Sequence, residues 1–165
     1  MQTGRSMVEL LGVIAIISML TVGALTGFPQ MRRSMNVSKT QNEIALIAQD
    51  LNNMTYWFRT YPTGFVDMDV LCENDIFPRK CEGGVAKNPF NGQYVVDTDK
   101  ETITTGPDGN PITEALIIEI TATGLPNLEV CEEIEKGVKE YGPLKDAETK
   151  CTSSGTTATI KVKFQ

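Results

Sequence analysis

The most distinctive pattern in the sequence is a predominantly apolar run from Met7 to Phe28, in which Glu9 is the one charged residue. As a helix rising about 1.5 Å per residue, this run spans roughly 33 Å, which is enough to cross the hydrocarbon core of a bilayer. A carboxylate near the start of such a run is costly unless it lies at the interface or meets a cation. The pattern therefore predicts a transmembrane helix in which Glu9 has a role beyond anchoring.

Three interpretations of this run compete: a secretory signal peptide, a plain membrane anchor, and an anchor that also packs against other helices. The run is longer than the usual apolar region of a signal peptide, and the Gly27-Phe28-Pro29 sequence after it is a poor cleavage site. Small residues favour close helix packing, and the run contains Gly12, Ala15, Ser18, Gly23, Ala24 and Gly27. These features favour an anchor and leave the plain and the packing anchor open.

A second helical pattern follows over residues 30–60. From Ile44 onward its apolar residues recur every three or four positions, at Ile44, Ile47, Leu51, Met54 and Phe58. Such an amphipathic stripe is typical of a helix that packs on a globular domain. Pro29 separates the two helical patterns, and because proline removes a helical hydrogen bond, we expect a kink or local melting there.

The remaining residues predict mainly strands and turns. Strands are expected at Gln93–Thr98 and, as a separate short piece, at Glu101–Thr105, because both are rich in β-branched residues. Alternation of apolar and polar residues predicts further strands at Ala115–Ala122 and Ala158–Gln165. Residues 62–92 are expected to form a loop.

One further helix is predicted from Leu125-Pro126-Asn127 to about Tyr141. Its apolar face consists of Leu128, Cys131, Ile134 and Val138. Residues 143–157 are polar and are expected to form a loop. The order of elements predicts an α+β fold, in which an antiparallel sheet packs on the C-terminal half of the long N-terminal helix.

Composition limits the chemistry that this chain can perform. Its 165 residues include no histidine and carry a net charge of −6. Histidine bases and histidine zinc ligands are thereby excluded, and no nucleophile-elbow, Walker or dinucleotide-binding motif occurs, so we expect no catalytic residues, no metal and no cofactor. Asp67, Asp69, Glu73 and Asp75 lack the spacing of a calcium-binding loop, and a solvated acidic loop is favoured. The absence of a basic patch of nucleic-acid type argues against a nucleic-acid partner.

The four cysteines all follow the apolar run. They have no Cys-x-x-Cys spacing, which disfavours a zinc or thioredoxin-like site, and in an oxidising compartment they are expected to form two disulfides. Of the three possible connectivities we expect the one that joins nearest neighbours, Cys72 to Cys81 and Cys131 to Cys151.

The sequence around the start of the apolar run, Gly4-Arg5-Ser6-Met7-Val8-Glu9, resembles the class III signal of the type IV pilin family, and most closely its type IVb-like members. The resemblance implies cleavage between Gly4 and Arg5 by a prepilin peptidase, N-methylation of Arg5, and a role for Glu9 in assembly. Arg5 stands where the family most often has Phe or Met. The Asn-Pro-aromatic turn at residues 88–92 and the strand–helix–cysteine–strand ending extend the resemblance.

The resemblance also implies a division of the chain. Residues 1–4 would be a leader peptide, residues 5–60 a long helix whose part 7–28 is the transmembrane segment and later the filament core, and residues 61–165 a globular α+β pilin head domain. In this family a helix-breaking position allows the segment to unwind within the filament, and Gly23, Gly27 and Pro29 are the candidates here.

The function implied by the resemblance is that of a structural pilus subunit, used for adhesion, motility or DNA transfer. The precursor would lie in the bacterial inner membrane, in contact with lipid, and then polymerise with other copies of itself into an extracellular pilus. Its further partners would be the prepilin peptidase, the assembly platform and minor pilins. Since Arg32 and Arg33 would lie on the outer side, which the positive-inside rule does not favour, this topology depends on the resemblance.

Alternatives remain within the family and outside it. A minor pilin or a type II secretion pseudopilin would share the long helix. The alternative of another class is a membrane-anchored periplasmic enzyme or binding protein. A third alternative is an adhesin or DNA-uptake module at a filament tip.

Overall fold

The computed structural model describes residues 7–58, 72, 81, 85–105, 109 and 111–164. The chain forms two compact units, one up to Met35 and one from Asn36 onward, and each is considered by itself. Helix α1 (Met7–Phe58) begins in the first unit and ends in the second. The boundary between the compact units therefore falls inside the helix. The described helix ends at Phe58, and because residues 59–71 lie outside the described ones, the expected division of the chain after residue 60 stays a prediction.

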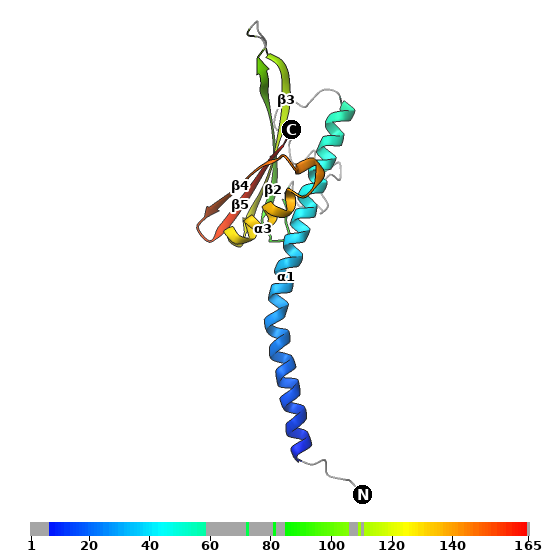
Figure 1. Cartoon of the computed structure of the whole chain (residues 1–165), viewed down its shortest axis with the longest axis vertical. Coiled ribbons are helices and arrows are strands. Elements are labelled where there is room, and N and C mark those ends of the chain that lie inside the picture. The colour runs from blue at the N-terminus through cyan, green and yellow to red at the C-terminus, as the bar shows by residue number, and fades with distance from the viewer. Residues whose placement is uncertain are drawn as a thin grey trace. The chain divides into compact units, whose positions relative to one another are not determined.

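The first unit consists, in its described part, of the N-terminal portion of α1 (Figure 1). By length and composition this helix is apolar enough to cross a membrane, which is weak evidence for anchoring. A kink or local melting was expected at Pro29; melting is wrong for this structure, because α1 continues through that residue without interruption. A proline removes one backbone donor, and here several helical turns on either side maintain the helix. Unwinding inside a filament stays a prediction.

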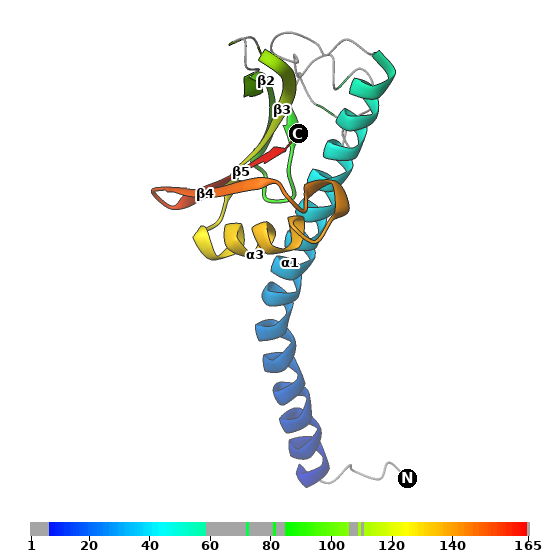
Figure 2. The same cartoon turned by 45° about the horizontal axis from the view of Figure 1, so that its top comes forward.

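The second unit is an α+β domain, in agreement with the predicted fold class. Among the described residues, five strands form one antiparallel sheet in the order β1-β2-β3-β5-β4 (Figures 1 and 2). The strands are β1 (Ala86–Lys87), β2 (Gln93–Thr105), β3 (Pro111–Leu125), β4 (Glu148–Ser154) and β5 (Thr157–Phe164). Helix α3 (Leu128–Val138) and the short 3-10 helix η1 (Gly142–Leu144) connect β3 to β4.

One face of the sheet carries the hydrophobic core. Alternate residues of β5, from Ala158 to Phe164, point into it together with Ile118 and Ile120 of β3. The C-terminal part of α1 supplies the apolar stripe predicted from its spacing: Val37, Ile44, Ile47 and Leu51 are buried in the same cluster. Helix α3 contributes Val130, Cys131, Ile134 and Val138. Leu128, expected on this face, is 42% exposed, and Val130 takes its place.

Several predicted strand limits were wrong. The two pieces expected at 93–98 and 101–105 are one strand, β2, because β3 is long enough to pair with both. The loop expected over residues 143–157 contains β4, which pairs with β5 from Glu148 to Ser154. The predicted loop over residues 62–92 contains β1 near its end, and most of that range lies outside the described residues.

Strand β3 was expected to end before Gly124. Instead it continues to Leu125 across a register shift. Gly124 has a φ of +72°, and a Cβ there would lie 2.8 Å from the Cα of Gly92. Buried Asn88 holds this close approach: its amide donates to the carbonyl of Thr123 at 2.7 Å, and its side-chain oxygen accepts from the backbone of Gly92. The Asn-Pro-Phe-Asn-Gly turn is therefore fastened to the bulge of β3.

Candidate functional site

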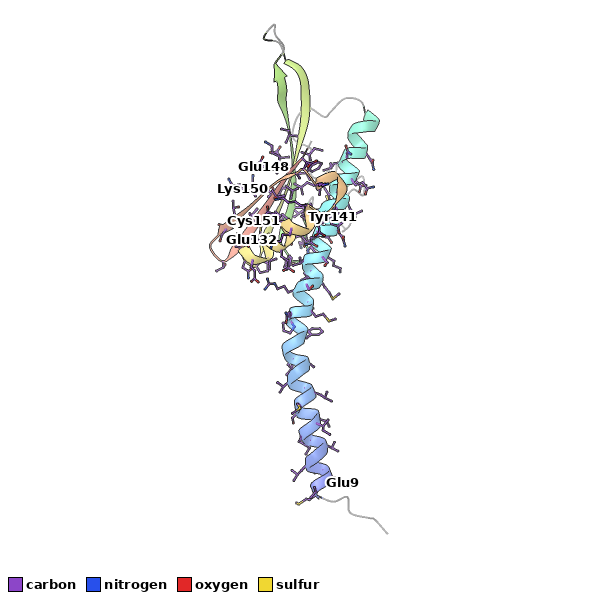
Figure 3. The ribbon with its side chains drawn as sticks, in the orientation of Figure 1. Glu9, Glu132, Tyr141, Glu148, Lys150 and Cys151 are labelled. Carbon is purple, nitrogen blue, oxygen red and sulfur yellow. A yellow bond between two sulfur atoms is a disulfide. The ribbon has the colours of Figure 1, made fainter. Side chains whose placement is uncertain are left out.

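The candidate site is the outer surface of α1 in the first unit. Glu9 lies in the first turn of the helix and is exposed (Figure 3). Within the described part of the chain it has no hydrogen-bond or ion-pair partner. Large apolar side chains surround it along the helix, and Leu10 and Val13 are each more than half exposed. An acid thus belongs to a surface that is otherwise apolar.

This apolar surface extends over the described part of the first unit and is interrupted by Arg32 and Arg33. Its exposed large hydrophobic residues are Met7, Val8, Leu10, Leu11, Val13, Ile14, Ile16, Ile17, Met19, Leu20, Val22, Leu25, Phe28, Met31 and Met35. A soluble monomer rarely exposes a contiguous apolar area of this extent, and such areas commonly mark surfaces that contact lipid or another protein.

The glycines of this helix leave gaps in the apolar surface. A Cβ built at Gly12, Gly23 or Gly27 would meet no atom within 4 Å. Packing within the described chain therefore does not require glycine at these positions. Positions without a side chain allow the backbone of a second helix to approach closely.

The predicted cleavage and methylation positions, Gly4 and Arg5, lie outside the described residues, as do the acids of the 67–75 loop. In the described part of the chain, no group of three or more Cys, Asp or Glu residues is placed to hold a metal ion. These expectations stay predictions.

Both predicted disulfides are confirmed. Cys72 is bonded to Cys81, and Cys131 is bonded to Cys151, with Cα atoms 5.7 Å and 6.0 Å apart respectively. The second disulfide joins buried Cys131 on α3 to β4, an edge strand of the sheet. It therefore ties this edge strand to the core.

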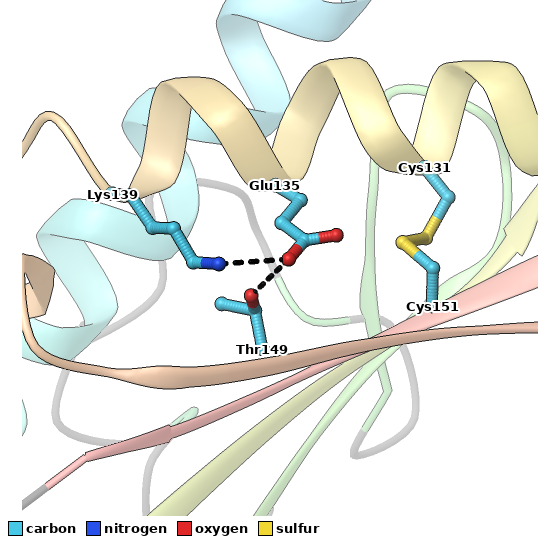
Figure 4. A network of polar contacts seen from close by, with 5 residues as sticks. All are labelled: Cys131, Glu135, Lys139, Thr149 and Cys151. Carbon is cyan, nitrogen blue, oxygen red and sulfur yellow. Dashed lines mark hydrogen bonds and ion pairs between the residues drawn. A yellow bond between two sulfur atoms is a disulfide. The ribbon is translucent and has the colours of Figure 1, made fainter.

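A polar cluster lies beside this disulfide (Figure 4). Glu135 of α3 accepts hydrogen bonds from the Thr149 hydroxyl at 2.5 Å and from the Lys139 ammonium at 2.9 Å. These contacts, above all the Thr149 hydroxyl, lower the pKa of Glu135 from its ordinary value, although partial burial acts in the opposite direction. The cluster is a second link between α3 and β4.

Helix α3 is also fixed to α1 within the second unit. The side chain of Gln41 donates from Nε2 to the carbonyl of Glu133 at 2.9 Å, and the hydroxyl of Tyr141 donates to Oδ1 of Asn42. Gln41 passes directly over Gly137, where a Cβ would lie 2.1 Å from Nε2. Sequence reasoning missed these contacts, since none of them follows a periodic pattern.

A buried carboxylate connects α1 to the sheet. Glu43 is 7% exposed, and its Oε2 accepts a hydrogen bond from the Tyr94 hydroxyl at 2.8 Å. A buried acid requires such partners because an isolated one would cost several kcal/mol. The hydrogen bond between Glu43 and Tyr94 therefore links α1 directly to β2.

The structure defines the class: an α+β protein with an antiparallel sheet domain and a long N-terminal helix whose first part exposes an apolar surface. Comparison of the chain with models of known protein families, with curated proteins and with solved structures finds no match. The functional argument therefore depends on the residues of this chain.

Proposed function

We propose that the chain is a precursor of the type IV pilin kind, a subunit that polymerises through the exposed surface of α1. The observation that carries this proposal is the long exposed apolar surface that contains the acid Glu9. A lipid anchor needs the apolar residues but not the acid. A helix that packs against copies of itself uses both.

The chemistry of assembly follows from that acid. Cleavage after Gly4 frees the α-amino group of Arg5, and the new terminus carries two cationic groups close to each other. A neighbouring copy offers its Glu9 carboxylate, and pairing removes the penalty of an isolated charge in an apolar surrounding, which amounts to several kcal/mol. Such a pair sets the axial register between two copies, because a shifted neighbour leaves both charges without partners.

The gaps at Gly12, Gly23 and Gly27 support the same proposal. Exchanging lipid contacts for contacts with another apolar helix yields little hydrophobic free energy, so close packing has to provide the attraction. Positions without side chains permit that approach.

The proposal is tested in the native host. Intact mass spectrometry of the membrane-extracted chain should show loss of residues 1–4, and filaments sheared from the cells should contain the same shortened chain. A chain that keeps its leader, or that is absent from every sheared filament, would refute the proposal. The amount of this chain relative to other filament proteins separates a major subunit from a minor pilin or a pseudopilin.

A further inference from the structure

The turn over residues 88–92 contains the one Asn-Gly pair of the sequence, Asn91-Gly92. The backbone nitrogen that follows an asparagine can attack the side-chain amide carbon, and glycine favours this reaction because it has no Cβ to hinder the approach. A new carbon–nitrogen bond closes a cyclic succinimide, and ammonia leaves. Water then opens the succinimide to aspartate or, through its other carbonyl, to isoaspartate.

The fold requires this labile pair at the turn. Asn91 has a φ of +69°, a left-handed conformation that glycine and asparagine adopt more readily than other residues. A Cβ at Gly92 would lie 1.8 Å from the carbonyl oxygen of Thr123, so a side chain at this position would displace β3. The close approach of the turn to β3 therefore fixes both residue types.

Asn88, which is 1% exposed, holds the nitrogen that would attack. Its Oδ1 accepts hydrogen bonds from the backbone nitrogens of Phe90 and Gly92, both at 3.0 Å, and its Nδ2 donates to the carbonyl of Thr123 at 2.7 Å. An N–H group that donates to a buried oxygen is fixed in direction and loses its proton less readily. The nitrogen of Gly92 is thus kept from the exposed side chain of Asn91.

We propose that Asn91 is a latent modification site, and that Asn88 prevents its conversion to isoaspartate while the turn stays closed. Isoaspartate adds a carbon atom to the backbone, and the closed turn has no space for it, since even a Cβ at Gly124 would lie 2.8 Å from the Cα of Gly92. A turn that opens and reacts therefore cannot return to its place against β3. The inference concerns the second unit and does not depend on the proposed function.

The test uses the full chain in detergent, incubated at mildly alkaline pH either folded or unfolded in urea. Peptide mass spectrometry follows the fraction of Asn91 that is converted. We expect conversion to be more than about twentyfold slower in the folded chain, because Asn88 bonds to both Gly92 and Thr123 and each net hydrogen bond shifts an equilibrium by about fivefold. Equal rates in the two states would overturn the inference.

Asn88→Ala identifies the residue responsible. It should raise the rate in the folded chain by about tenfold, since it removes both side-chain bonds. The matched control is Asn127→Ala, which removes the bond to the backbone of Val130 at the start of α3 and destabilises the same unit without touching the turn. Circular dichroism checks that both variants are folded. An Asn88→Ala chain that reacts no faster than Asn127→Ala would contradict the role of Asn88.

Two further measurements decide the matter if Asn88→Ala does not fold. Hydrogen exchange at the Gly92 amide of the wild type should be strongly protected, and exchange at the rate of an exposed amide would overturn the inference. Asn91→Gly keeps the left-handed conformation and has no side-chain amide to react. After incubation in urea it should refold completely, whereas the wild type should lose refolding in proportion to its isoaspartate. Complete refolding of the modified wild type would show that the turn tolerates the change.

Discussion

Glu9 is the residue on which the proposed function depends, because it is the one charge between Met7 and Phe28 of the exposed apolar surface. We predict that Glu9→Leu and Glu9→Gln leave membrane insertion unchanged and reduce filaments by more than tenfold, since a neutral residue cannot pair with the amino terminus of a neighbour. Electron microscopy of sheared filaments and carbonate extraction of membranes measure the two effects.

Two controls accompany this experiment. Glu9→Asp keeps the charge and should retain part of the assembly, whereas Glu132→Gln removes an exposed acid from α3 and should have no effect. Wild-type amounts of filament in Glu9→Leu would show that the acid is dispensable and would favour a plain anchor.

Glu135 gives the second unit a specific response to acid. Its contacts lower its folded-state pKa, so the unfolded chain binds more protons when the pH falls. The stability that the carboxylate contributes is complete above the ordinary glutamate pKa of about 4.3 and is lost as the pH falls through the lowered folded pKa. We predict that Thr149→Val raises the pKa of Glu135 and makes the loss of stability between neutral and acid pH smaller.

Urea denaturation at a series of pH values measures that loss, and an NMR titration of Glu135 measures the pKa. Thr152→Val is the control, because Thr152 lies on the same strand but bonds to the carbonyl of Thr159 rather than to the carboxylate. Identical pH profiles for wild type and Thr149→Val would contradict the prediction.

At the scale of single elements, α3 was predictable and β4 was not. The buried residues of α3 recur in the sequence with the 3.6-residue period of a helix. Asn127 caps this helix by accepting a hydrogen bond from the backbone of Val130. Strand β4 has few apolar residues, and it is held by pairing with β5, by the Cys131–Cys151 disulfide and by Thr149. Such an edge strand has no alternating pattern to detect.

The packing of α3 on α1 yields a coupling between Gly137 and Gln41. Alanine is a better helix former than glycine by about 1 kcal/mol, but a Cβ at Gly137 would displace the Gln41 side chain from its bond to Glu133. We predict that Gly137→Ala brings no gain in the wild-type chain and stabilises the Gln41→Ala variant by about 1 kcal/mol.

Chemical denaturation of the four members of this cycle measures the coupling. Gly142→Ala serves as the control, because a Cβ at Gly142 would meet no atom within 4 Å, and it should not couple to Gln41. Additive effects of Gly137→Ala and Gln41→Ala would disprove the contact.

At the scale of the whole molecule, one helix belongs to two compact units with opposite surface properties. Up to Met35 its large apolar residues are exposed, and from Val37 onward the apolar stripe is buried in the core of the second unit. A domain as small as the second unit buries a limited core, so its stability is modest, and the disulfides raise that stability by constraining the unfolded chain.

The disulfide between Cys131 and Cys151 spans 20 residues and joins β4 to the rest of the second unit. We predict that Cys131→Ala/Cys151→Ser lowers the free energy of unfolding by about 3 kcal/mol in the loop-entropy model. Thermal unfolding with and without reductant measures the effect. Reductant should destabilise the wild type more than this variant, and equal sensitivity of the two would contradict the prediction.

The sequence by itself determined the apolar helix, the buried stripe of its second part, the pairing of the cysteines and most strands. These features depend on local period or on short separation along the chain, and both can be read from neighbouring residues. Only the tertiary structure decided that β4 is a strand, that Glu43 is buried against Tyr94, and that Gly137 lies under Gln41. The Glu43–Tyr94 and Gln41–Gly137 contacts join residues that are distant in the chain, which leaves no periodic trace in either partner. Strand β4 pairs with β5, the strand directly after it, but its mostly polar sequence has no apolar alternation to detect.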